Sequence, residues 1–218
     1  MRQSATRELH SYWSGLRGER AAPERADVDP VAFRGVLPDT FMLEVDDARR
    51  FPVVLAGSRC NAIFGTGLKG SSFVDLFDAE DRCQIAGICS NVCDDAAPAV
   101  AGLKAAAVGG QALDLEMLLL PLRHRGKTHS RILGSFAPAG FPHWLGLVPV
   151  ARLSLVSMRM ILPAETRRRG GGAERVPPGR AGDATARGFA SRRAAFAVVR
   201  GGRSGPPEPR GGARITLV

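Results

Sequence analysis

Residues 51–77, FPVVLAGSRCNAIFGTGLKGSSFVDLF, run from a short apolar segment directly into a compact turn and helix. The apolar residues 51–56 predict a strand, which Gly57 ends. Residues 58–64 are compatible with a short helix, and three glycines then interrupt the chain before the next apolar segment. This order, with strand-like segments on either side, predicts a small antiparallel sheet that packs against short helices.

The segments that flank this stretch supply another strand and the longest helix. Residues 41–46 alternate apolar and polar side chains, as a half-buried strand does, and predict a hairpin with 51–56. Residues 79–94 predict a helix capped by Asp78, because apolar residues recur at intervals of three and four. These apolar positions are Ile85, Ile88, Cys89 and Val92. The helix therefore offers one apolar face to the sheet.

Three further strands are expected after the long helix. Residues 98–108 and 111–122 predict a second hairpin, in which Gly109-Gly110 supplies the positive φ angles of a tight turn. Residues 130–137 predict a fifth strand. Residues 142–162 add either one more strand or a packing arm, and their pattern leaves both alternatives open.

An amphipathic helix near the start of the chain presents an apolar face at i, i+3, i+4 and i+7. The fourth strand is also apolar on its outer side, so that side needs a cover. Two alternatives stay open: the helix packs on its own domain, or these surfaces form a homodimer or partner interface. The candidate interface residues are Leu9, Tyr12, Trp13 and Leu16 on the helix and Leu118 and Leu120 on the strand.

Charge divides the chain into a nearly neutral part and a basic tail. Of the 30 Lys and Arg and the 21 Asp and Glu, residues 163–218 hold 12 and 4, so the tail carries a net charge of +8. We expect an N-terminal helix and connector at 1–30, one folded domain at 31–162, and a disordered tail rich in Arg, Gly and Pro at 163–218.

The tail has three interpretations. Its Arg-Gly-Gly triplets, which begin at Arg169, Arg200 and Arg210, can contact nucleic-acid phosphates or an anionic membrane in a salt-sensitive way. Because only Phe189 and Phe196 are available for stacking on bases, a solvated basic tail is the simpler alternative. A shifted reading frame in a GC-rich gene would give the same composition.

Signals of cofactor, metal or catalytic chemistry are weak. The glycines of residues 65–70 have the spacing G-x-G-x-x-G but follow a helix rather than a strand, so a turn-rich loop is expected. Cys89 and Cys93 share a helix face without Cys83 or any His, so no metal site is expected. No catalytic motif is recognised, so we expect a non-enzyme with no catalytic residues and assign no cofactor.

The sequence also predicts a compartment. Four Cys in 218 residues, no hydrophobic signal core in residues 1–13 and no apolar run near 18 residues predict a cytoplasmic protein without a membrane span.

The order strand, strand, short helices, long helix and three strands is the succession found in PAS domains, and local motifs strengthen the match. On these motifs the chain resembles the compact bacterial PAS family whose members are mostly a single such domain. The similarity covers residues 10–162 and leaves the tail unmatched. The motifs are Tyr12-Trp13, Leu16-Arg17-Gly18, Arg20, Pro23, Arg25, Asp29-Pro30, Leu37-Pro38, Leu55-Ala56-Gly57, Phe64-Gly65, Leu68-Lys69-Gly70, Leu118-Leu119-Leu120-Pro121-Leu122, Ile132-Leu133-Gly134 and Trp144-Leu145-Gly146.

The resemblance implies an α+β fold: a five-stranded antiparallel sheet with short helices and one longer helix on one face, plus the N-terminal amphipathic helix. It implies a sensor or adaptor in signal transduction, which forms a homodimer and acts on a signalling partner through a small ligand or through constitutive protein contacts. The second hypothesis is a nucleic-acid-associated protein that binds through its tail. The candidate pocket-lining residues, which solid core explains equally well, are Leu43, Leu55, Ile85, Cys89, Val92, Met117 and Phe136.

Overall fold

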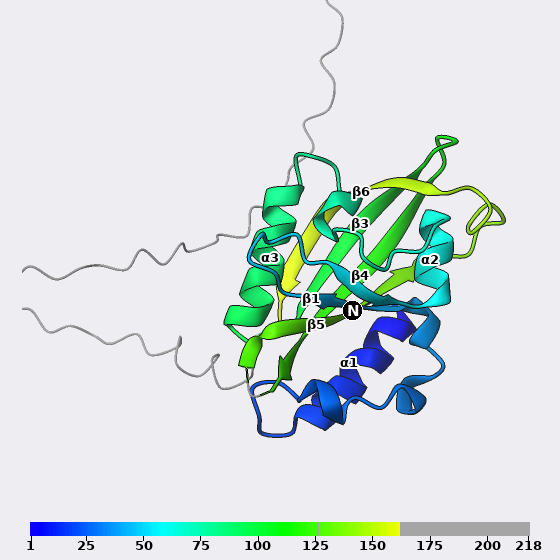
Figure 1. The fold of residues 1–218 in the computed structure, drawn as a ribbon. Coiled ribbons are helices and arrows are strands. Elements are labelled where there is room, and N and C mark those ends of the chain that lie inside the picture. The colour runs from blue at the N-terminus through cyan, green and yellow to red at the C-terminus, as the bar shows by residue number, and fades with distance from the viewer. Residues whose placement is uncertain (126, 162–218) are drawn as a thin grey trace, which may run out of the picture. The chain divides into compact units, whose positions relative to one another are not determined.

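The computed structural model describes residues 1–125 and 127–161, so the basic tail lies outside the described residues. Its strands form one antiparallel sheet in the order β2-β1-β5-β4-β3-β6 (Figure 1). The strands are β1 Thr40–Glu44, β2 Val53–Ala56, β3 Ala99–Ala107, β4 Ala112–His124, β5 Lys127–Pro138 and β6 Val150–Met160. The helices are α1 Ser4–Arg17, α2 Ser58–Phe64 and α3 Arg82–Asp94, with 3-10 turns η1 Arg25–Asp27, η2 Pro30–Phe33, η3 Leu37–Asp39 and η4 Val74–Leu76.

Both expected hairpins are confirmed. β1 pairs with β2, and β3 pairs with β4 from Ala99 opposite Leu119 to Ala106 opposite Ala112. In the turn between β3 and β4, only one of the two expected glycines has a positive φ: Gly110, at 83°, adopts the left-handed conformation without strain, and Gly109 does not adopt it.

The sheet contains six strands, one more than expected. β6 pairs antiparallel with β3, from Val150 opposite Ala107 to Met160 opposite Ala99. Residues 142–162 therefore include a strand rather than only a packing arm. Register shifts at Ala151 and Val156 interrupt the two-residue alternation of β6, so the pattern alone did not decide between the strand and the packing arm.

α3 begins at Arg82 rather than at residue 79, and Asp78 does not cap it. The Asp78 carboxylate instead accepts a hydrogen bond from the Ser154 hydroxyl at 2.5 Å. The Asp81 carboxylate accepts the backbone N–H of Leu155 at 2.7 Å. Two acidic residues that suit a helix start thus hold the first half of β6 against the turn before α3.

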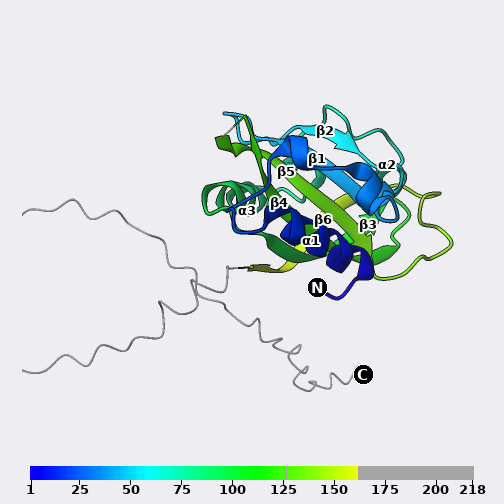
Figure 2. The same ribbon diagram turned by 90° about the horizontal axis from the view of Figure 1, so that it is seen from below.

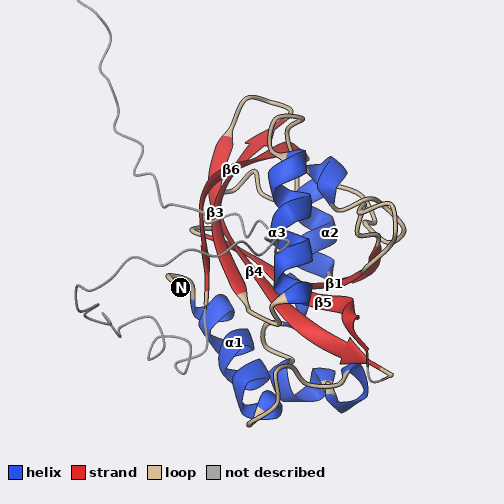
Figure 3. Cartoon of the chain, turned by 90° about the vertical axis from the view of Figure 1, so that its left-hand side faces the viewer, coloured by secondary structure: helices blue, strands red, loops and turns tan. Residues whose placement is uncertain are grey.

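Helices cover the sheet on both faces, as Figures 2 and 3 show. We call the face toward α2 and α3 the inner face and the face toward α1 the outer face. Each face has its own cluster of buried apolar side chains. On the outer face, Leu9 and Trp13 of α1 are 0% and 3% exposed, so the N-terminal segment packs on the sheet of its own chain.

Candidate functional site

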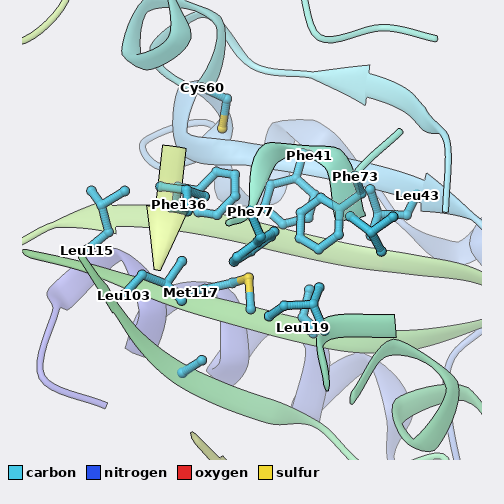
Figure 4. Packing of buried hydrophobic residues seen from close by; sticks show 14 of the residues in the cluster. Phe41, Leu43, Cys60, Phe73, Phe77, Leu103, Leu115, Met117, Leu119 and Phe136 are labelled. Carbon is cyan, nitrogen blue, oxygen red and sulfur yellow. The ribbon is translucent and has the colours of Figure 1, made fainter. Parts of the chain in front are cut away.

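Phenylalanine side chains fill the inner face of the sheet (Figure 4). Phe41 of β1 and Phe136 of β5 lie with their ring centroids 4.7 Å apart. Phe73, from the segment before η4, lies 5.2 Å from Phe41 and 5.5 Å from Phe77. Such spacings are those of directly packed aromatic pairs. Neither of the two cavities described below is lined by any of these four rings.

Six of the seven candidate pocket-lining residues lie in this inner cluster: Leu43, Ile85, Cys89, Val92, Met117 and Phe136. Leu55 does not, because it is 52% exposed. It lies directly opposite Met42, which belongs to the outer cluster, and residues opposite each other share a face of the sheet. A bulge between Met42 and Leu43 shifts the register of β2 and separates Leu55 from the inner set.

The six candidate interface residues come together on the outer face of one chain. Leu9, Trp13, Leu118 and Leu120 are buried there, and Tyr12 and Leu16 pack against them with part of their surface exposed. The indole N–H of Trp13 also donates to the backbone oxygen of Pro121 at 2.9 Å. This arrangement agrees with the first of the two alternatives that the sequence left open, in which the helix packs on its own domain.

Glu116 on β4 supplies the cap that α1 lacks. The N-cap residue of α1, Gln3, makes no side-chain capping bond. The Glu116 carboxylate instead accepts the backbone N–H groups of Arg2 at 2.7 Å and Gln3 at 3.1 Å. Burial opposes the ionisation of this carboxyl, but the hydrogen bonds outweigh burial and lower the pKa of Glu116. Beside it opens a groove of about 570 Å³, which Arg2 and Arg159 help to line.

Replacing Glu116 by Gln is expected to lower the free energy of unfolding at pH 7 by on the order of 1–2 kcal/mol, because two hydrogen bonds to a charged acceptor are weakened. Since the pKa of Glu116 is lower in the folded state, its contribution is complete above the unfolded pKa of about 4.3 and is lost as the pH falls through the folded value. Urea unfolding at pH 7 and again below the folded pKa measures both effects.

The matched control for Glu116→Gln is Asp114→Asn on the same strand. The Asp114 side chain is 70% exposed and pairs with Lys104 at 3.3 Å, so its loss should be nearly neutral. A Glu116→Gln deficit that stayed the same at all pH values would contradict the capping role.

A second cavity, of about 100 Å³, lies between α2 and the loop that follows β5. At its edge, Nε and Nη2 of Arg59 each donate to one oxygen of Asp39, both at 2.6 Å. The Asp39 side chain is 6% exposed and the Arg59 side chain 45%. The hydrogen bond with Asp39 raises the pKa of Arg59. Sequence reasoning missed this pair, because no local spacing connects two residues that are 20 positions apart.

The buried cysteines have unreactive thiols. Burial raises the pKa of the Cys60 and Cys93 thiols to about 12 and raises that of Cys89 as well. They therefore stay protonated at neutral pH, and a protonated thiol is neither a nucleophile nor a metal ligand. Among the side chains of residues 1–125 and 131–161, no group of three or more His, Cys, Asp or Glu is placed to hold a metal ion.

The fold is an antiparallel sheet with short helices and α3 on its inner face and a capped N-terminal helix on its outer face. A family model described as a PAS domain matches residues 1–137. The chain belongs to this PAS family, which confirms the resemblance seen in its motifs. PAS domains are in general signal-sensing modules. No curated protein matches the chain.

Solved structures similar to this chain include other PAS and LOV proteins. The LOV protein of Rhodobacter sphaeroides is 16% identical, with a TM-score of 0.39 over 48% of this chain and 61% of that one. This chain thus spans less than two thirds of its length. A PAS domain from Colwellia psychrerythraea is 12% identical, with a TM-score of 0.40 over 50% and 97% of the two chains. The PAS domain of an HTR-like protein from Haloarcula marismortui is 19% identical, with a TM-score of 0.33 over 45% and 80%.

In the described part of the chain, the helices are all too short or too polar to cross a membrane.

Proposed function

We propose that this chain is a non-catalytic, cytoplasmic PAS signalling adaptor that acts through protein contacts which do not depend on a small ligand. The observation that carries the proposal is the packed inner face. Small-molecule sites are typically cavities of about 300–1,000 Å³. The groove of that size beside Glu116 lies along β3, β4 and β6 and not among the inner phenylalanine rings. A ligand of that size on the inner face would have to displace the phenylalanine cluster, whose rings are almost fully buried.

The six inward candidate residues fit this proposal as a packing core between α3 and the sheet. Leu43, Ile85, Cys89, Val92 and Phe136 are 0% exposed and Met117 is 1% exposed. A change in the packing of α3 would therefore alter the sheet directly, because close-packed interiors transmit strain.

A homodimer is part of the same proposal. Tyr12 and Leu16 are the candidate interface residues that keep exposed surface beside the packed outer face. The other four are covered by their own chain and would contribute to an interface only if α1 moved away. The alternative nucleic-acid hypothesis depends on residues 163–218, which lie outside the described residues.

Native mass spectrometry of the full chain, purified without denaturation, tests the proposal together with an absorption spectrum. We expect protomers of 23.1 kDa without added ligand mass, no visible absorption band, and a dimer or a complex with a partner protein. A denatured aliquot gives the covalent mass for comparison. A small molecule retained in the native sample and lost on denaturation would contradict contacts that are independent of a ligand.

A further inference from the structure

The loop between β5 and β6, residues 139–149, is firmly held yet exposes two large apolar side chains. The backbone N–H groups of Leu147 and Val148 both donate to the oxygen of Trp144 at 2.9 Å. The Trp144 side chain is 8% exposed and anchors the loop in the inner cluster. Phe141 and Leu147 are nevertheless 72% and 80% exposed. Neighbouring exposed apolar side chains on a loop whose backbone is hydrogen-bonded are candidates for an interaction surface.

This loop lies beside α2, on the right of Figure 1. Two close approaches connect them: a Cβ on Gly65 would lie 2.8 Å from the ring of Pro149, and a Cβ on Gly146 would lie 3.8 Å from Ala62. Because the contacts join the loop to a helix, the surface between them is already formed before any partner arrives. Preformed surfaces cost little conformational entropy on binding.

Phe141 forms one wall of the 100 Å³ cavity, and Ile63 of α2 and Leu145 of the loop line it as well. That volume corresponds to about three water molecules and is far below the usual size of a small-molecule site. It suits a single aliphatic side chain. An apolar cavity open to solvent between an exposed aromatic residue and a helix is the kind of pocket that an anchoring side chain of a partner fills.

Arg59 gives the cavity a charged edge. Its Nε and Nη2 atoms donate to Asp39, whereas Nη1 makes no hydrogen bond with the side chains that the structure describes, those of residues 1–125 and 131–161. The side chain lines the cavity and is 45% exposed, so Nη1 can donate to an acceptor from outside. Hydrogen bonds between a guanidinium and a carboxylate are stronger than those to a neutral acceptor. Asp39 also lines the cavity and balances the charge of Arg59, but its side chain is 6% exposed and binds the Nε and Nη2 edge of the guanidinium. The exposed Nη1 atom is therefore the donor that an acidic group next to the apolar anchor would meet.

We propose that the cavity and the 139–149 loop dock a short extended segment of a partner protein, with a leucine-like side chain in the cavity and a neighbouring carboxylate on Arg59. The inference rests on the proposed adaptor role and names the chemistry of the partner. Phe141 and Leu147 then cover the rest of the segment.

An NMR titration of the ¹⁵N-labelled full chain tests the cavity with N-acetyl-leucine as the probe. We expect shifts at residues 59–63 and 141–146. We expect at least tenfold weaker binding of N-acetyl-alanine, which lacks the anchor, and of N-acetyl-leucinamide, which lacks the carboxylate.

Ala62→Phe should weaken binding of N-acetyl-leucine at least tenfold, because Ala62 is exposed and a larger side chain there enters the cavity without disturbing the core. The matched control is Val31→Ala, at a residue that is 67% exposed but does not line the cavity. Equal binding of the acid and the amide, or shifts elsewhere only, would overturn the proposal.

A blocked tetrapeptide, acetyl-Ala-Leu-Asp-Ala-amide, distinguishes a docked segment from a bound small acid. We expect it to bind at least tenfold more tightly than N-acetyl-leucine. Leu147→Ala should weaken binding of the peptide but not binding of N-acetyl-leucine, because Leu147 lies on the loop but does not line the cavity. A peptide that bound no better than N-acetyl-leucine would overturn segment docking. If a partner complex in native mass spectrometry persisted in the Phe141→Ala variant, this site would be wrong while the adaptor role stood.

Discussion

Replacing Phe136 by Ala is expected to lower the free energy of unfolding by about 3–5 kcal/mol, the usual cost of removing a buried aromatic ring from a core. Phe136 is 0% exposed, and its ring centroid lies 4.7 Å from that of Phe41 and 6.0 Å from that of Phe64. Its loss leaves a cavity between β5 and α2 that the surrounding rings cannot close without moving. Urea unfolding followed by circular dichroism measures the change.

The control for this variant is Phe141→Ala, which removes the same side chain from a surface. Because Phe141 is 72% exposed, its replacement should change the free energy of unfolding by no more than about 0.5 kcal/mol. If the two variants were equally stable, the inner face would not be the packed core that the proposed function requires. Binding of apolar compounds by the Phe136→Ala protein, but not by the parent, would confirm that the space is normally filled.

Trp13→Ala should cost a similar amount, about 3–5 kcal/mol, and should also uncover the outer face of the sheet. Trp13 is 3% exposed, its indole N–H binds the oxygen of Pro121, and Arg17 lies 5.5 Å from the ring centroid. A helix of 14 residues without a side-chain cap of its own is marginal in water, so α1 should unfold once it leaves the sheet. Fluorescent-dye binding and self-association are therefore expected to increase together with the loss of stability.

Two further variants separate packing from helix propensity. Ser14→Ala changes an exposed neighbour in α1 and should leave stability and dye binding nearly unchanged. Trp13→Phe keeps most of the apolar area but leaves the Pro121 oxygen without its donor, and should cost about 1 kcal/mol. Full stability in Trp13→Ala would show that α1 does not hold the outer face in solution.

The hydrophobic pattern predicted most of the elements correctly because period and burial are directly linked. Ile85, Ile88, Cys89 and Val92 recur at helical spacing and are all buried against the sheet. The expected inward position was wrong for Leu55, since a one-residue bulge reverses the face of every residue beyond it and no local pattern records where a bulge falls. The same kind of irregularity, at Val156, interrupts the alternation of β6, where the pattern left a strand and a packing arm as open alternatives.

The sequence by itself determined the α+β order of elements, the membership of the PAS family and the two apolar faces of the sheet, since these follow from local periodicity and motifs. Only the tertiary structure decided that α1 covers the outer face of its own chain, that Glu116 caps this helix, and that Asp39 and Arg59 meet at the edge of a small cavity. The reason is physical. These contacts join residues up to 114 positions apart, and their free energy depends on distances and burial that exist only after the chain has folded.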